Sequence, residues 1–184
     1  MRFFRYSLSQ ILLNLQMHIL AIYGSLFFLD NRCFLEFSYM IALLQRVNYA
    51  KVVVEGKTVG EIDKGILVFL GLERDDNEQL CHKMFDKIVK YRMFYDENGK
   101  MNLNVSQVNG NVLVVSQFTL AANTSSGNRP SFDPAMPPAE AKELYDKFML
   151  YAEEKLPTVQ HGEFAADMKV DLENDGPVTF ILKL

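Results

Sequence analysis

Two runs rich in apolar residues constrain the fold of this chain more than any other feature of its sequence. They are Gly65–Leu72 (GILVFLGL) and Val112–Phe118 (VLVVSQF). Successive side chains of a strand point to opposite faces, so such a run predicts a strand that is buried on both faces. A sheet with two strands of this kind has to be covered, and the chain is therefore expected to fold in layers.

Two segments with helical periodicity can supply a cover. Asn77 predicts the start of a helix that continues to about Tyr91, and Pro137-Pro138 opens a second helix that ends before Pro157. Their apolar stripes are Leu80, Met84 and Ile88 in the first helix, and Ala141, Leu144, Phe148 and Ala152 in the second.

Shorter segments rich in β-forming residues predict the other strands: Ile41–Ala50, Lys51–Glu55, Glu163–Asp171 and Val178–Leu184. Tight turns are expected at Glu55–Lys57, at Asn98-Gly99 and at Asn174–Pro177. The expected fold is a mixed α/β domain with mainly antiparallel strands and two amphipathic helices packed on the sheet, in a layered β/β/α arrangement.

The first 39 residues differ from the rest, because no charged residue lies between Arg5 and Asp30. The segment is open to three interpretations: an over-extended start, a membrane anchor of sufficient length behind Arg2 and Arg5, or an export signal. The first is favoured, since a regular globular pattern begins at Met40. We therefore expect an apolar leader at residues 1–39 and a domain at residues 40–184 with a net charge of -5.

Composition and motif content exclude several functions. The whole chain has 23 acidic and 19 basic residues, which argues against a protein that coats nucleic acid. Its two cysteines and three histidines lack the spacing of a zinc site, and no nucleophile elbow, phosphate loop or dinucleotide-binding glycine pattern is present. Cys81 and His82 are adjacent on a helix and do not face one another, so we expect Cys81 in the core and His82 at the surface. No metal and no cofactor are expected.

Two motifs remain. In Ser116-Gln117-Phe118-Thr119-Leu120 a buried strand runs into a polar loop, where freed backbone amides could hold an oxyanion, although the same pattern fits a simple loop. Asn174–Thr179 (NDGPVT) is first of all a turn signal, and nothing local requires a cis bond before Pro177.

Together these motifs identify a resemblance. Residues 40–184 closely resemble the D-aminoacyl-tRNA deacylases, through SQFTL, NDGPVT and the blocks MIALLQRV, GILVFLGLERDD, KMNLNV and FAADMKV. The resemblance implies a cytoplasmic homodimer that hydrolyses the ester of D-aminoacyl-tRNA, and of glycine mischarged on tRNA, as a chirality proofreading step. The active sites are then expected at the subunit interface.

The resemblance also implies roles for eight residues. Ser116, Gln117, Phe118 and Thr119 match the catalytic strand end, where attack by Thr119, by water or by the substrate 2′-OH stays open. Gly176-Pro177 matches a cis pair that enters the partner's pocket and clashes with an L-side chain. Arg46 matches an arginine that fixes this pair, and Met168 matches a pocket-lining position. Their alternatives are a surface cation for Arg46 and core packing for Met168.

The implied partner is the 3′ end of a D-aminoacyl-tRNA, with no DNA partner. Basic residues that could contact tRNA are Lys83, Lys87, Lys90, Arg92, Lys100 and Arg129, which also fit a solvated surface. We expect weak, salt-sensitive binding of tRNA. Two rival functions are a tRNA-end-binding module without turnover and an esterase of the same fold that acts on another acyl substrate.

Overall fold

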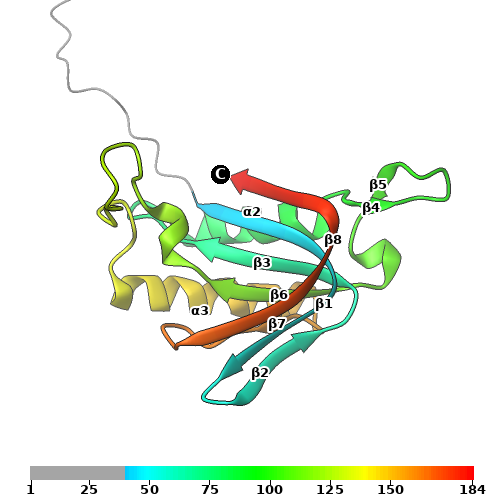
Figure 1. The fold of residues 1–184 in the computed structure, drawn as a ribbon, viewed down its shortest axis with the longest axis horizontal. Helices are drawn as coiled ribbons and strands as arrows, with labels where there is room; N and C mark the ends of the chain where they lie inside the picture. Colours follow the sequence, from blue (N-terminus) through cyan, green and yellow to red (C-terminus); the bar gives the residue numbers. More distant parts are fainter. Residues whose placement is uncertain (1–39) are drawn as a thin grey trace, which may run out of the picture. The chain divides into compact units, whose positions relative to one another are not determined.

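The computed structural model describes residues 40–184, so the predictions for residues 1–39 lie outside the described part of the chain. A six-stranded sheet has the order β2-β1-β3-β6-β7, with β8 paired to β1 (Figure 1). Its strands are β1 (Ile41–Val54), β2 (Lys57–Ile62), β3 (Gly65–Gly71), β6 (Asn111–Ser116), β7 (Gln160–His161) and β8 (Met168–Lys183). Pairing is antiparallel around β1 and parallel for β3–β6 and β6–β7.

The helices are α2 (Glu78–Lys90) and α3 (Pro138–Lys155). Asn77 caps α2 by accepting a hydrogen bond from the Leu80 amide, as the sequence predicts. Short elements complete the fold: β4 (Phe94–Tyr95) paired with β5 (Met101–Leu103), and two 3₁₀ turns, η1 (Ser106–Val108) and η2 (Phe118–Ala121). No helix within residues 40–184 combines the length and the apolar character that are needed to cross a bilayer.

One face of the sheet packs against both helices. Alternate residues of the central strands, such as Leu44, Val68 and Val114, are buried in one core with the stripes predicted for α2 and α3. Met84, Ile88 and all four residues predicted for α3 are buried, whereas Leu80 is only partly buried against this core. The mixed α/β arrangement with helices on the sheet is therefore confirmed.

The other face is covered in part by the sheet itself. A second core, which includes Val52, Leu67 and Leu113, lies between the C-terminal half of β1, β2 and the strands β3 and β6. The sheet curls so far that β2 approaches β7: a Cβ built on Gly60 would lie 2.5 Å from the carbonyl oxygen of His161. Glycine is needed at this position because two backbones meet there.

Two predicted boundaries near the C-terminus are wrong, and the predicted strands Ile41–Ala50 and Lys51–Glu55 form the single strand β1. Residues 163–167 form a turn and not a strand, and β8 begins only at Met168. The predicted turn at Asn174–Pro177 lies inside β8, which pairs with β1 on both sides of it: Asn174 lies opposite Val47, and Thr179 lies opposite Gln45. Four residues of β8, 175–178, therefore lie opposite the single residue Arg46 of β1, which makes this segment a bulge and not a reversal of the chain.

Asp76 is a buried carboxylate in the loop between β3 and α2. One of its oxygens accepts a hydrogen bond from the Glu73 amide at 2.8 Å, and the other has no partner among the described residues. Burial, reinforced by the nearby carboxylates of Glu73 and Asp75, raises the pKa of Asp76 from 3.8 to about 6. The folded protein therefore holds this proton at pH values where the unfolded chain has released it.

Asp76→Asn is expected to flatten the pH dependence of stability. A raised pKa in the folded state means that the contribution of Asp76 is fully present below pH 4 and is lost as the pH rises to about 6, which amounts to as much as about 3 kcal/mol. The difference in unfolding free energy, variant minus wild type, should grow by that amount between pH 4 and pH 7 in urea titrations. Asp63→Asn, which changes an exposed carboxylate, serves as the control. Parallel curves for wild type and Asp76→Asn would contradict the expectation.

Candidate active site

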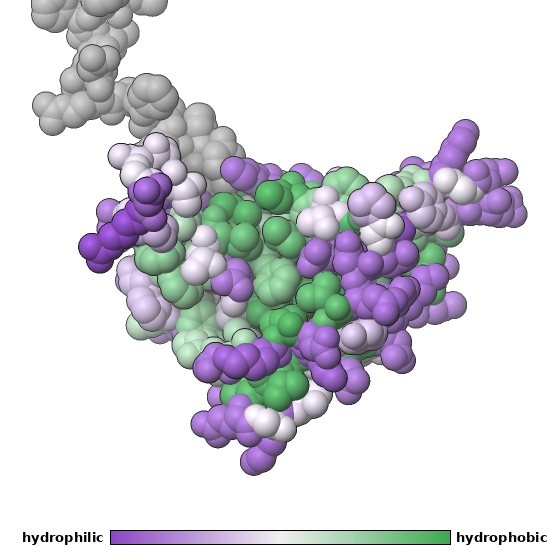
Figure 2. Space-filling model, in the orientation of Figure 1, coloured by the Kyte–Doolittle hydropathy of each residue, from purple (hydrophilic) through white to green (hydrophobic). Residues whose placement is uncertain are grey.

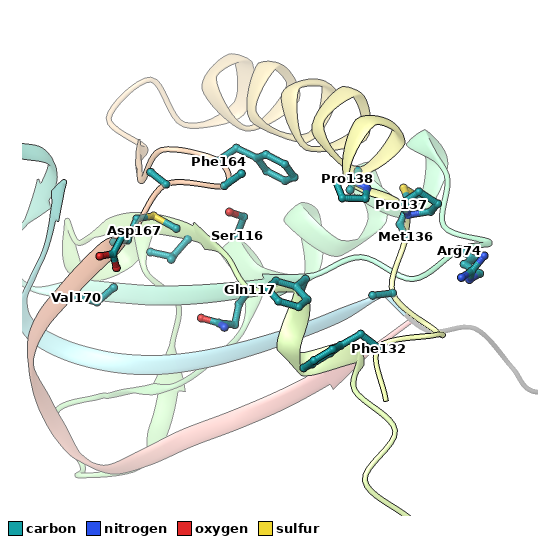
Figure 3. Close-up of a pocket in the computed structure, with 17 residues that line it drawn as sticks. Arg74, Ser116, Gln117, Phe132, Met136, Pro137, Pro138, Phe164, Asp167 and Val170 are labelled. Carbon is teal, nitrogen blue, oxygen red and sulfur yellow. The ribbon is translucent and has the colours of Figure 1, made fainter. Parts of the chain in front are cut away.

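A cavity of about 780 Å³ opens at the end of β6 (Figure 3). Four segments line it: the end of β6 with the start of η2, the connection from β7 into β8, the loop that leads into α3, and the loop after β3, which contributes Arg74. The predicted residues Ser116, Gln117, Phe118 and Met168 all line it. The structure thus brings together four of the eight predicted site residues.

The strand end is held firmly against β3. The Gln117 amide donates to the Leu70 carbonyl at 2.7 Å. A Cβ on Gly71 would lie 2.9 Å from the Cβ of Leu120, so η2 packs directly on the end of β3. This contact stops β6 at Ser116 and turns the chain into η2. The predicted strand Val112–Phe118 is therefore two residues too long at its end, and Phe118 begins η2 instead.

The turn into η2 leaves backbone donors at the cavity. The first amides of a helix have no acceptor within that helix. Among the described residues, no backbone hydrogen bond uses the amides of Phe118 and Thr119. Two successive free N–H groups beside Ser116 are suited to stabilise negative charge that develops on a carbonyl oxygen.

Thr119 does not line the cavity and is exposed. Its hydroxyl oxygen accepts a hydrogen bond from the Gln117 side chain, and no described histidine or carboxylate contacts it. His82 stacks on Tyr151, and the Nδ1 atom of His161 lies 2.8 Å from the Gly162 carbonyl oxygen. Thr119 therefore lacks the adjacent base that an activated hydroxyl nucleophile needs.

Cys81 is also unsuited to nucleophilic attack. It is buried in the helix-side core, as predicted, and burial raises the pKa of its thiol to about 12. His82 lies next to it in the sequence and is half-buried against Tyr151, so it is less exposed than predicted.

Arg46, Gly176 and Pro177 form a second group, which does not line the cavity. Arg46 is buried: its Nε lies 2.8 Å from the Asp175 carboxylate, and its Nη1 donates to the Met93 carbonyl at 2.8 Å. The guanidinium also lies over the Tyr95 ring. Arg46 is thus not a surface cation but holds the residue that precedes Gly176.

The Gly176-Pro177 peptide bond is cis, and both residues are exposed in the bulge of β8. Asn174 closes this bulge, because its side-chain amide donates to the carbonyls of Arg46 and Val178 at 2.9 and 3.2 Å. The pair is therefore exposed on a segment that is held by Arg46 through Asp175 and by Asn174.

Several cavity residues were not predicted from the sequence. They are Arg74, Phe132, Pro137, Pro138, Phe164 and Asp167. Of the lining residues only Arg74 and Asp167 carry charge, and Figure 3 shows them at opposite ends of the cavity. Arg74 belongs to the block GILVFLGLERDD, and Phe164 and Asp167 belong to FAADMKV. Membership of these blocks, which carry the resemblance, is the one signal that could have indicated them.

A cavity at a strand end with free amides is typical of enzymes that act on acyl groups. Comparison with known proteins gives the family: residues 43–183 match the model of the D-Tyr-tRNA(Tyr) deacylase family, and the chain belongs to it. Proteins named D-aminoacyl-tRNA deacylase from Shewanella pealeana, Saccharophagus degradans and Haemophilus influenzae are 59%, 57% and 58% identical to it. Each alignment spans 145 residues, which is 79% of this chain and 100% of the relative.

Solved structures agree on the fold. A protein named c-Myc DNA Unwinding Element Binding Protein is 38% identical, with a TM-score of 0.74 over 78% of this chain and 97% of its own. A probable eukaryotic D-amino acid tRNA deacylase has a TM-score of 0.69 over 79% of this chain and 100% of its own. Because the second is only 14% identical, it supports the fold alone.

Proposed function

We propose that the protein hydrolyses the ester of D-aminoacyl-tRNA and releases a free D-amino acid and tRNA. The observation that carries the proposal is identity of 57–59% with curated D-aminoacyl-tRNA deacylases over their full length. The cavity with free amides at the end of β6 supports it. Hydrolysis of glycine mischarged on tRNA and a role in chirality proofreading are part of the proposal. So is a cytoplasmic location, because charged tRNA is found there.

The proposed reaction uses positioning and the backbone amides. The ester carbonyl oxygen is placed toward the amides of Phe118 and Thr119, which stabilise the oxyanion when water attacks the carbonyl carbon. The bond from that carbon to the ribose oxygen then breaks, and the ribose oxygen takes up the proton that the attacking water loses. The neighbouring 2′-OH of the substrate can pass this proton, since the one carboxylate among the described lining residues, Asp167, is paired with Lys169.

Thr119→Ala is expected to lower kcat by less than about tenfold. The Thr119 hydroxyl is bound by the Gln117 side chain and has no adjacent base, so its removal takes away neither the oxyanion donors nor the nucleophile. Single-turnover deacylation of D-tyrosyl-tRNA measures the effect, and Ser125→Ala in the exposed loop is the control. A loss of several orders of magnitude would instead show that Thr119 is the nucleophile.

Chirality is proposed to be read by Gly176-Pro177 of a partner subunit. This pair lies outside the cavity of its own subunit, is exposed, and is fixed through Asp175 by Arg46. A rigid exposed segment of this kind can enter a second molecule and occupy the space that an L-side chain would need. Glycine, which has no side chain, would be accepted.

A homodimer is proposed to form through the sheet face that the helices leave open. Four residues in register, Ile181, Leu43, Phe69 and Val115, form an apolar row across β8, β1, β3 and β6. Ile181 is 60% exposed, Leu43 and Phe69 are half-buried, and Val115 lines the cavity. Figure 2 shows hydrophobic residues gathered on this side of the domain. An apolar row that leads to the cavity supports an interface beside the active site.

A deacylation assay with matched D-tyrosyl-tRNA and L-tyrosyl-tRNA tests the proposed function. We expect rapid hydrolysis of the D-ester and rates near the uncatalysed rate for the L-ester. Equal rates on both would indicate an esterase with another substrate. Binding of tRNA without any hydrolysis would indicate a tRNA-end-binding module, the other alternative that the sequence leaves open.

A further inference from the structure

The rim of the cavity carries a cation and two aromatic rings that the proposed hydrolysis does not use. Arg74 is the only basic residue among the described lining residues. Phe118 and Phe132 are 59% and 41% exposed, although large apolar side chains are normally buried. Their ring centroids are 5.1 Å apart at an interplanar angle of 62°. These three side chains form one end of the cavity, here called the rim.

Arg74 is held in place by the loop that carries Phe132. Its backbone amide donates to the Pro134 carbonyl at 3.1 Å, and its side-chain Nε donates to the Asp133 carbonyl. A bridge between Glu73 and Ala135 adds a further link between the two segments. The guanidinium is thereby fixed on the carbonyl of Asp133, the residue that follows Phe132.

This arrangement leaves part of the guanidinium available. Nε is used by the Asp133 carbonyl, while the two Nη groups have no acceptor among the described residues. Arginine presents such N–H groups in a planar fork that fits a phosphate. The acidic end of the cavity is different, because Asp167 is paired with Lys169 at 2.7 Å.

A cation beside exposed aromatic rings is the combination with which proteins hold single-stranded nucleic acid. Bases stack on the rings, and the cation contacts the backbone phosphate. The substrate of the proposed function offers both groups next to its ester: the terminal adenosine is joined by a phosphodiester to a preceding nucleotide. A cavity of about 780 Å³ can hold the esterified adenosine, which leaves the preceding nucleotide at the rim.

We propose that the rim binds the nucleotide that precedes the esterified adenosine, with Arg74 on the connecting phosphodiester and Phe132 against the preceding base. The inference rests on the proposed function, since it extends the substrate by one nucleotide. One cation and one stacked base provide a modest contribution, which suits an enzyme that grips only the end of a tRNA and then releases it.

The experiment compares two small substrates, the D-tyrosyl ester of adenosine and the D-tyrosyl ester of the dinucleotide cytidylyl-adenosine. The readout is the ratio of kcat/KM for the dinucleotide ester to that for the adenosine ester. We expect Arg74→Gln and Phe132→Ala each to lower this ratio about tenfold. With D-tyrosyl-tRNA, Arg74→Gln should also reduce the slope of log(kcat/KM) against log salt by about 0.7.

Two further variants separate binding of the phosphodiester by Arg74 from the support that its Nε hydrogen bond gives to the loop of Phe132. On the two small esters Arg92→Gln is the matched control, because exposed Arg92 also donates from Nε to a backbone carbonyl, that of Asn102, but lies outside the cavity and could contact only the body of a whole tRNA. Its ratio should equal that of wild type. Arg74→Lys keeps the charge and loses the planar fork. Its ratio of kcat/KM values should therefore lie between those of wild type and Arg74→Gln.

The inference is overturned if Arg74→Gln keeps the wild-type ratio, if Arg92→Gln lowers it equally, or if Arg74→Lys behaves like Arg74→Gln. If wild type hydrolyses neither ester, the proposed function fails separately. The inference is then decided by calorimetric titration of cytidylyl-adenosine and adenosine: wild type should bind the dinucleotide more tightly, and Arg74→Gln should lose the difference.

Discussion

Arg46→Ala is expected to lower the free energy of unfolding by about 2–4 kcal/mol, because it removes a buried cation that joins three parts of the domain. The Met93 carbonyl would lose its donor inside the core, and the half-exposed Asp175 carboxylate would lose its counter-charge. Urea unfolding measures the change. Lys51→Ala is the matched control, since it breaks an exposed pair with Asp171 between the same strands and should cost less than about 1 kcal/mol.

A substitution of Arg46 should also weaken the discrimination between D- and L-esters if Gly176-Pro177 rejects L-side chains. Arg46→Lys keeps the charge but cannot reach Asp175 and Met93 together in the same planar geometry. At a temperature where the variant is folded, we expect a larger rate on L-tyrosyl-tRNA relative to D-tyrosyl-tRNA than in wild type. A destabilised variant that still does not hydrolyse L-tyrosyl-tRNA would show that Arg46 contributes to stability and not to chiral discrimination.

Ile181→Glu is expected to separate the proposed dimer and to lower deacylation of D-tyrosyl-tRNA by more than about 100-fold, a loss of about 2.7 kcal/mol in transition-state stabilisation. Ile181 is 60% exposed at the start of the apolar row, so a buried carboxylate would be created only when two subunits meet. Sedimentation velocity and the deacylation rate, both measured against protein concentration, report the two effects.

Leu150→Glu provides the comparison, because Leu150 is 62% exposed on α3, on the helix side of the domain. It should leave both the sedimentation coefficient and the rate unchanged. An Ile181→Glu protein with the sedimentation coefficient and activity of wild type would exclude the open sheet face as the interface.

Local signals in the sequence predicted the elements that depend on neighbouring residues. Examples are the Asn77 cap, the apolar stripe of α3, and the apolar runs that form β3 and β6. Each of these signals depends only on residues that are close together in the sequence. The bulge in β8 was predicted as a turn, since NDGP has turn chemistry. Only pairing with β1, more than 120 residues away, keeps the strand continuous.

The candidate site divides in the same way. Ser116 to Thr119 could be identified because strand and loop meet within a few residues. The position of Arg74 beside Phe132 depends on backbone bonds to Asp133 and Pro134, which link segments about 60 residues apart. No spacing rule connects such segments, so the cation at the rim could not be derived from the sequence.

The pairing of β1 with β8 also bears on when the domain can form during synthesis. The first described residue and the last exchange two hydrogen bonds, from the Met40 amide to the Leu184 carbonyl and back, at 3.0 and 3.2 Å. Because β8 supplies the neighbour of β1 along nearly its whole length, β1 keeps an unpaired edge until β8 has left the ribosome. The cavity, whose wall includes Met168 and Val170 of β8, is completed only then, so the candidate active site does not exist before β8 has been synthesised.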